Sequence, residues 1–206
     1  MYKGTNASDG IGIGTAVIVE EAELIITRRE VNDTEAEVQR FKGALETTIA
    51  ETQKMAEDLA ARVGEKEAEI MQGHMMLLSD PMLTGEIENS IQNDKVNSEF
   101  AIENVCNMYA DMFASMGDEL MQQRATDMRD IKVRMQRTLM GLQSVDVSAL
   151  PAGTILVAKD LTPSMTAGIN PANVTGIVTE LGGRTSHSAI LARALEIPAV
   201  VAVNGL

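Results

Sequence analysis

Residues 176–203 read GIVTELGGRTSHSAILARALEIPAVVAV, and their pattern changes three times. The β-branched run 176–179 predicts a strand, and the pair Gly182-Gly183 predicts a tight turn. Residues 186–195 are rich in alanine and leucine and predict a helix, after which the final residues of the stretch predict a second strand. A strand, a helix and a strand in this order form a βαβ unit, so this part of the chain should be α/β.

Other segments extend the predicted sheet. Residues 154–158 are β-branched and predict a strand, and residues 163–168 predict a short helix that begins at a proline. Residues 15–19 predict a strand that joins the same sheet. Glycines at alternate positions of 10–14 suggest a phosphate-binding loop, but such a loop precedes a helix and here a strand follows, so we reject that interpretation.

The middle of the chain has the apolar period of helices. A long amphipathic helix should begin at Thr34 and end before Gly64. Four further helices are predicted at 65–78, at 82–92, from Asn97 or Ser98 to Gly117, and from Asp118 to Gly141. Short loops make the neighbours antiparallel, so we expect an all-α bundle inserted in an α/β domain. The predicted parts are 1–21 and 142–206 of the α/β domain and 22–141 of the bundle.

Composition and charge limit the class of protein. The 206 residues are 45% hydrophobic and 23% charged, which excludes a disordered tail. Residues 20–150 hold 26 acidic and 13 basic residues, which is the whole net charge of -13, so binding to nucleic acid or an anionic membrane is disfavoured. No apolar run approaches the roughly 20 residues of a membrane-spanning helix. The single cysteine and the polar N-terminus predict a cytoplasmic location.

His187 is the strongest candidate for chemistry. It lies at the start of a predicted helix, where unpaired backbone N–H groups stabilise an anion such as phosphate. Arg184, Thr185 and Ser186 would add a cation and hydroxyl donors. An imidazole of ordinary pKa, about 6.5, is mostly neutral at cytoplasmic pH, so a ring nitrogen could attack phosphorus. The alternative is that His187 is merely a polar residue of the first helical turn.

Two other chemistries are disfavoured. Ser186 lacks the Gly-x-Ser-x-Gly context of a hydrolase nucleophile. Two histidines and one distant cysteine do not form a zinc-binding spacing. Cys106, in a predicted helix, should be a buried thiol.

The stretch GGRTSHSAILAR, followed by LEIPAVV, resembles the phosphohistidine signature of the phosphoenolpyruvate-utilising enzymes. Four further stretches resemble the N-terminal part of Enzyme I of the sugar phosphotransferase system: ASDGIG at 7–12, GHMMLLSD at 73–80, RATDMRDI at 124–131 and DLTPS at 160–164. The resemblance covers essentially the whole chain. It implies an α/β phosphohistidine domain with an inserted helical subdomain.

The resemblance also implies roles for single residues. His187 would be phosphorylated on Nε2, and the hydroxyl of Thr166 would bond the imidazole at rest. Arg193 is interpreted as a packing or charge-balancing residue.

The helical subdomain would dock the phosphocarrier protein HPr, whose basic patch the acidic bundle would complement. The candidate docking residues are Glu65, Glu67, Glu69, His74, Met76, Leu77, Met82, Leu83, Arg124 and Arg129. Each of them could equally belong to the bundle core or to a solvated face. The 14 methionines are more often core than interface.

The implied activity is that of a phosphoenolpyruvate-protein phosphotransferase. Phosphoenolpyruvate would phosphorylate His187, which would pass the phosphoryl group to HPr in bacterial sugar uptake. We expect a monomeric fragment, truncated after Leu206, that binds no metal itself; the missing C-terminal domain would bind phosphoenolpyruvate and Mg²⁺ and form the homodimer. The alternatives are the swivelling domain of a pyruvate phosphate dikinase or phosphoenolpyruvate synthase, and a non-catalytic helical docking module.

Overall fold

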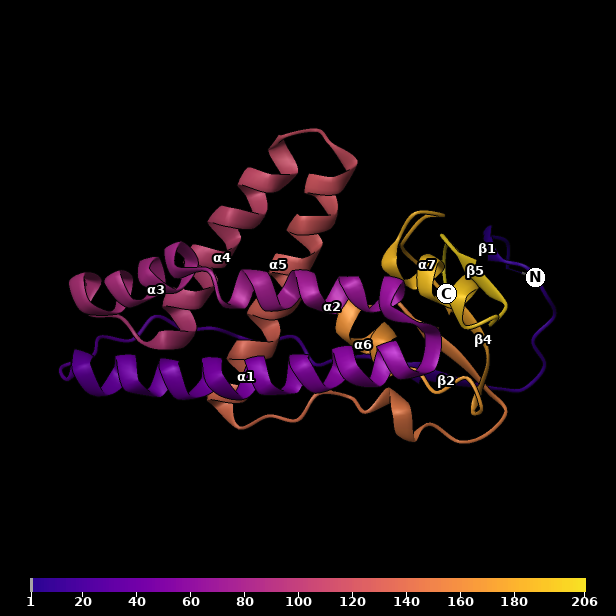
Figure 1. Ribbon diagram of the computed structural model, residues 1–206, viewed down its shortest axis with the longest axis horizontal. Coiled ribbons are helices and arrows are strands. Elements are labelled where there is room, and N and C mark those ends of the chain that lie inside the picture. The colour runs from indigo at the N-terminus through magenta and orange to yellow at the C-terminus, as the bar shows by residue number, and fades with distance from the viewer. Residues whose placement is uncertain (1) are drawn as a thin grey trace. The chain divides into compact units, whose positions relative to one another are not determined.

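The computed structural model describes residues 2–206, which form two compact units (Figure 1). One unit, which we call the α/β unit, consists of residues 2–22, Met55–Glu69 and Val145–Leu206. The other, the helical unit, consists of Glu23–Lys54 and Ile70–Ser144.

The α/β unit is built on a five-stranded sheet. Its strands are β1 Thr5–Ser8, β2 Thr15–Val19, β3 Thr154–Ala158, β4 Val174–Thr179 and β5 Ala199–Val201. Their order is β1-β5-β4-β3-β2; the four strands from β2 to β5 run parallel, and β1 is antiparallel to β5. The predicted strand at 15–19 therefore does join the sheet, as the parallel partner of β3.

Three short helices complete this unit: the 3-10 helix η1 Val147–Ala149, α6 Pro163–Gly168 and α7 His187–Ala194. Along β3, buried Thr154, Leu156 and Ala158 alternate with half-buried residues, because successive side chains of a strand point to opposite faces. Leu156 and Ala158 join Ile169 and Ala189 in one apolar core. The core holds α6 and α7 against the sheet.

The end of α1 also belongs to the α/β unit. The predicted bundle range 22–141 includes Met55–Glu69, but this segment groups with the sheet. The guanidinium of Arg62 donates hydrogen bonds to the carbonyl oxygens of Ala167 and Ile169 at the end of α6. These bonds satisfy carbonyls that a helix terminus leaves unpaired, so they connect α1 to α6.

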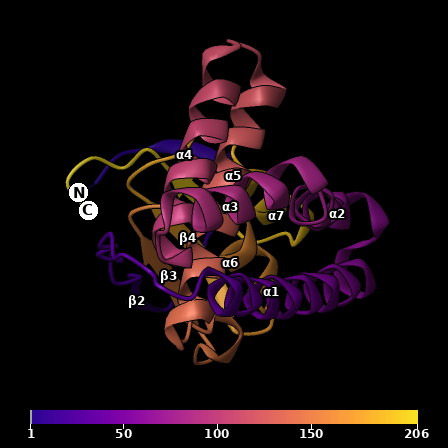
Figure 2. The same cartoon turned by 90° about the vertical axis from the view of Figure 1, so that its left-hand side faces the viewer.

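The helical unit contains most of α1 Thr34–Val63 and α2 Glu65–Leu78, together with α3 Pro81–Asp94, α4 Ser98–Ser115 and α5 Glu119–Met140. The side chains of Asp80 and Asp118 accept hydrogen bonds at the N-termini of α3 and α5, and Gly141, with a φ of 65°, ends α5. Figures 1 and 2 both show α4 and α5 side by side, joined by a short turn. Their facing sides bury Ile102 and Ile131 completely.

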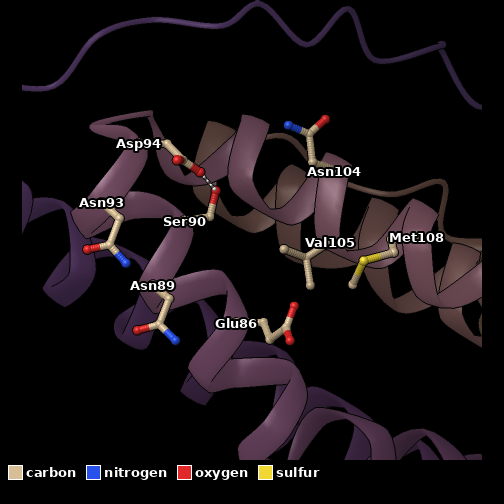
Figure 3. A pocket seen from close by; sticks show the side chains of 8 residues that line it. All are labelled: Glu86, Asn89, Ser90, Asn93, Asp94, Asn104, Val105 and Met108. Carbon is tan, nitrogen blue, oxygen red and sulfur yellow. Dashed lines mark hydrogen bonds between the residues drawn. The ribbon is translucent and has the colours of Figure 1, made fainter.

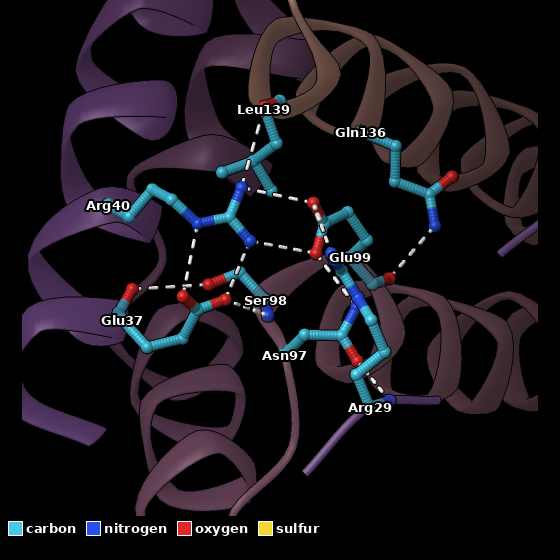
Figure 4. Close-up of polar contacts among 8 residues, drawn as sticks. All are labelled: Arg29, Glu37, Arg40, Asn97, Ser98, Glu99, Gln136 and Leu139. Carbon is cyan, nitrogen blue, oxygen red and sulfur yellow. Dashed lines mark hydrogen bonds and ion pairs between the residues drawn. The ribbon is translucent and has the colours of Figure 1, made fainter. Parts of the chain in front are cut away.

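A partly buried ion network supports the start of α4 (Figure 4). The guanidinium of Arg40 lies 2.6 Å from a carboxylate oxygen of Glu37 and 2.8 Å from one of Glu99. Asn97 donates to Glu99 at 2.8 Å, and Glu37 accepts the backbone N–H of Ser98 at 2.6 Å. Burial alone would raise the pKa of Glu99, but the hydrogen bonds from Arg40 and Asn97 outweigh it and lower that pKa to about 2.

The predicted fold class is confirmed, and the predicted helices differ from the observed ones by a few residues at most. One strand was not predicted, and one expectation is corrected. β1 has no sequence signal for a strand and was not predicted, because TNAS lacks an apolar alternation. Several methionines are exposed although core was the expected place for most: Met76, Met82, Met108, Met112, Met116 and Met140.

Candidate functional site

His187 is the first residue of α7 and follows the loop that leaves β4. Gly182 in this loop has a φ of 96°, a left-handed conformation that favours glycine. The N–H of Ser186 donates to the carbonyl of Gly183 at 3.1 Å, which closes a turn with Arg184 and Thr185 as its central residues. The imidazole is therefore presented at a helix N-terminus, directly after a tight turn. Only 9% of the residue's surface is exposed.

Ser186 has a structural part in this turn. Its hydroxyl donates to the carbonyl of Gly183 at 2.8 Å and caps α7 by accepting the N–H of Ala189 at 3.3 Å. The hydroxyls of Ser186 and Ser188 also lie 2.9 Å apart, and either one can be the donor of this contact. Both serine hydroxyls therefore take part in hydrogen bonds around the start of α7.

Arg184 and Thr185 are exposed, so their donors can reach a ligand. Arg193 was interpreted as a packing or charge-balancing residue, and the structure shows that it also makes two hydrogen bonds. Its Nη1 donates to the carbonyl of Arg184 at 3.0 Å and to that of Ala7 in β1 at 2.9 Å. Arg193 therefore ties the turn before α7 to the edge strand of the sheet.

Helix α6 packs against α7 and carries Thr166, which was predicted to bond the imidazole of His187. Thr166 is buried, and its hydroxyl donates to the carbonyl of Thr162 at 2.7 Å. That hydroxyl can still accept a bond from an imidazole N–H. Asp160, just before α6, interacts with the charge of His187. Partial burial of its carboxyl group raises the pKa of Asp160, while the N–H of Leu161 and His187 lower it.

The predicted docking residues fall in both units. Glu65, Glu67 and Glu69 lie in the segment of α2 that belongs to the α/β unit, and the others belong to the helical unit. Met76 and Met82 are 72% and 67% exposed. Arg129 is also exposed, and Leu77 and Arg124 are half-buried.

His74 and Leu83 lie beneath the surface, since both are buried. They can support a docking surface but not form its outer face. Further exposed apolar side chains not among the docking candidates follow one another at helical spacing on α4 and its C-cap: Met108, Met112 and Met116. Their spacing of four residues was visible in the sequence, but the same spacing is typical of a core face.

A hollow between α3 and α4 offers no place for an anion (Figure 3). Its lining contains the carboxylates of Glu86 and Asp94 and no basic side chain. Ser90 donates to Asp94 at 3.0 Å, and asparagines, Val105 and Met108 complete the wall. Because the carboxylates repel a phosphate, this hollow is not a second phosphoryl site.

Cys106 is completely buried in the helical unit, as predicted. Burial raises the pKa of its thiol to about 12, so the reactive thiolate is scarce at neutral pH. Among residues 2–206, no cluster of three or more histidine, cysteine or acidic residues could hold a metal ion. In the same range no helix has the length and apolar character needed to cross a bilayer.

Two family models match the chain: "PEP-utilising enzyme, N-terminal" over residues 3–124 and "PEP-utilising enzyme, mobile domain" over residues 150–206. The chain belongs to the PEP-utilising enzymes. Within that family it is similar to phosphoenolpyruvate-protein phosphotransferase. It is 46% identical over 199 residues to that protein of Listeria monocytogenes and 43% identical over 199 residues to that of Bacillus subtilis. Each match covers 97% of this chain and 35% of the relative, so the chain spans about a third of these relatives.

Solved structures agree. An NMR solution structure of Enzyme I matches all of this chain and 84% of its own, with 40% identity and a TM-score of 0.84. A structure titled "N-terminal domain of Enzyme 1 - Nitrogen" matches all of this chain and 85% of its own, with 27% identity and a TM-score of 0.68. The chain therefore corresponds to the N-terminal region of Enzyme I, and the predicted family is confirmed. The similarity includes the helical unit, which favours Enzyme I over a dikinase swivel domain.

Proposed function

We propose that this chain carries a phosphoryl group on His187 and exchanges it with HPr, as part of a phosphoenolpyruvate-protein phosphotransferase. One observation carries the proposal. His187 begins α7 directly after a strand and a turn, in the segment that matches the mobile domain of PEP-utilising enzymes. Helix termini of this kind supply amide donors and a partial positive charge to a phosphoryl group.

The transfer needs no acid or base from the rest of the chain. The lone pair of a neutral imidazole nitrogen, Nε2 by the family resemblance, forms the new N–P bond while the bond from phosphorus to the donor breaks. The donor keeps the electron pair of the broken bond, and the PO₃ unit passes over without oxidation or reduction. The cost is mainly positioning and charge neutralisation, for which Arg184 and the backbone amides of the turn are available.

Access to the ring is part of the proposal. With 9% of its surface exposed, His187 cannot meet the histidine of a carrier protein in its present position. We therefore expect its side chain to turn outward, or the segments covering it to open, before each transfer. A small phosphoryl donor should reach the ring more readily than a protein does.

The other parts of the reaction lie outside this chain. We place phosphoenolpyruvate binding, Mg²⁺ binding and dimer formation outside this chain, which covers only 35% of its relative from Listeria monocytogenes. The residues around His187 do not fit a metal site, since no cluster of three ligands exists among residues 2–206, and no step proposed for this chain uses Mg²⁺. The reaction would take place in the cytoplasm and serve sugar uptake.

Incubation with phosphorylated HPr tests the proposal. The chain should acquire phosphate that is labile in acid and stable in base, His187→Ala should abolish labelling, and His74→Ala should retain it. Phosphoenolpyruvate alone should not label the chain. HPr binding without any labelling would support the non-catalytic docking module and overturn the phosphoryl carrier.

A further inference from the structure

Helix α2 has a buried glycine, Gly73, in its interior, where glycine is among the least favourable residues. Its backbone is no reason for a glycine, because Gly73 does not have a positive φ. The reason lies on α5. Outside the backbone of α2, the three atoms that would be nearest to a Cβ atom on Gly73 all belong to the guanidinium of Arg124. Nη1 of Arg124 would overlap this Cβ atom, so the guanidinium can occupy its position only because residue 73 is glycine.

Asp127 holds the guanidinium in this position. Its Oδ2 lies 3.2 Å from Nη1 of Arg124, and its Oδ1 lies 3.2 Å from Nε2 of His74. Asp127 and His74 are both buried, so the carboxylate is a fixed partner rather than a mobile surface group. The place of the guanidinium is therefore set by a buried carboxylate and by the missing side chain of Gly73.

Arg124 keeps donors for a partner protein. Its side chain is 34% exposed, and within residues 2–206 no hydrogen bond engages its Nε or Nη2. Exposed apolar side chains neighbour this position on both helices. Met76 follows Gly73 by three positions on α2, and Leu120 lies one turn before Arg124 on α5. An arginine held beside exposed apolar groups is typical of protein–protein interfaces.

We propose that Gly73 and Asp127 are positioning residues for docking, which fix the guanidinium of Arg124 so that its remaining donors bind an oxygen acceptor of HPr. This inference rests on the proposed function, in which HPr exchanges the phosphoryl group with His187. Arg124 is already a docking candidate, and the inference adds the two residues that set its geometry. Gly73 has no side chain and Asp127 is buried, so neither of them needs to touch HPr.

The test compares Gly73→Ala with the unsubstituted 206-residue chain in stopped-flow binding of HPr. The added Cβ atom should displace the guanidinium without changing any charge. The association rate and its salt dependence should therefore stay the same. Dissociation should be about tenfold faster, the effect of losing one hydrogen bond from a charged donor. The urea midpoint should not fall, because alanine is the better helix former.

A second substitution separates positioning from a general effect on α2. If Gly73 acts through Arg124, Gly73→Ala should not change dissociation when Arg124→Gln is already present. Asp127→Asn should also accelerate dissociation, and its effect should vanish in the same background; Gly73→Ala carries the test if Asp127→Asn does not fold. The matched control is Gly43→Ala in α1, where a Cβ atom would meet nothing within 4 Å, and it should leave HPr dissociation unchanged.

The outcomes separate the two claims. A folded Gly73→Ala chain with the unsubstituted dissociation rate, or with the same acceleration in the presence of Arg124→Gln, would overturn the positioning role. An unsubstituted chain that does not bind HPr would overturn the proposed docking, and the role of Gly73 and Asp127 with it. Labelling of His187 by potassium phosphoramidate, a small donor that needs no docking, reports on the phosphoryl carrier separately.

Discussion

Nε2 of His74 lies 3.2 Å from Oδ1 of Asp127, and both side chains are buried. On the other side of the ring, Nδ1 lies 3.8 Å from Oδ2 of Asp130. Arg124 contacts the second oxygen of Asp127 at 3.2 Å and covers Gly73, where a Cβ atom would collide with its guanidinium. His74 thus connects α2 to α5 beneath the surface and supports Arg124, which is half-exposed.

This contact predicts a structural effect of His74→Ala. The substitution leaves two buried carboxylates without the imidazole between them, and a lost hydrogen bond to a charged group costs about 1.5–3 kcal/mol. Urea unfolding should show a free energy of unfolding lower by about 2 kcal/mol, whereas Gln72→Ala, at an exposed position of the same helix, should change little. An unaltered midpoint for His74→Ala would show that the contact contributes nothing to stability.

The sequence predicts what is local and misses what is distant. Asp118 and Gly141 mark the ends of α5 because each acts on its own helix terminus. The burial of His74 depends on Asp127, 53 positions away, and no helical period contains that information. β1 is also a product of distant pairing, since its register is set by β5 near the other end of the chain.

In the candidate site, too, the sequence predicts the local features but not the contacts between distant residues. The turn and the helix around His187 are contiguous, so their pattern alone predicts a phosphoryl site there. A serine hydroxyl can donate a hydrogen bond to phosphate, so the sequence suggested that role for Ser186. That the same hydroxyl caps α7 and bonds to Gly183 can be seen only in the folded structure. The bond from Arg193 to Ala7 spans 186 positions and could not be predicted.

The ion network around Arg40 predicts sensitivity to acid. The pKa of Glu99 falls from 4.5 to about 2, so its carboxylate contributes stability above about pH 4.5 that is lost as the pH falls towards 2. The contribution is of the order of 3 kcal/mol. Glu99→Gln should therefore lower the free energy of unfolding at pH 7 and flatten its decline between about pH 5 and pH 2.

Arg40→Leu provides the cross-check for this network. It should reduce the decline of the free energy of unfolding between about pH 5 and pH 2, because Arg40 is the main hydrogen-bond donor to Glu99. Adding Glu99→Gln to it should then have a smaller effect than in the unsubstituted chain. Fully additive effects would mean that the two side chains stabilise the fold independently.

Asp160 should influence the protonation of His187. A nearby carboxylate favours the imidazolium form, so Asp160→Asn should lower the pKa of His187 relative to the unsubstituted chain. Asparagine retains an oxygen that can accept the N–H of Leu161, which Asp160 accepts at 2.8 Å. NMR titration of the His187 ring measures the shift, and an equal or higher pKa in the variant would contradict the interaction.

The exposed methionines of α4 predict an apolar docking surface for HPr. Met108, Met112 and Met116 are 51%, 42% and 55% exposed, and a spacing of four residues puts them near one face of the helix. Changing all three to glutamine should leave the free energy of unfolding within about 0.5 kcal/mol, because they contribute little to the core. The affinity for HPr, measured by calorimetry, should fall at least tenfold. The control variant Met140→Gln, at the end of α5, should bind HPr with the affinity of the unsubstituted chain.

The net charge of -13 should act on a different step of the proposed docking. Complementary charges accelerate encounter, whereas desolvated apolar contacts slow dissociation. Raising the salt concentration from about 0.05 to 0.5 M shortens the screening length well below 10 Å and should lower the association rate of HPr. The methionine variant should instead dissociate faster and keep the same salt dependence of association. Stopped-flow kinetics separates the two rates, and an association rate independent of salt would remove the acidic surface from the docking mechanism.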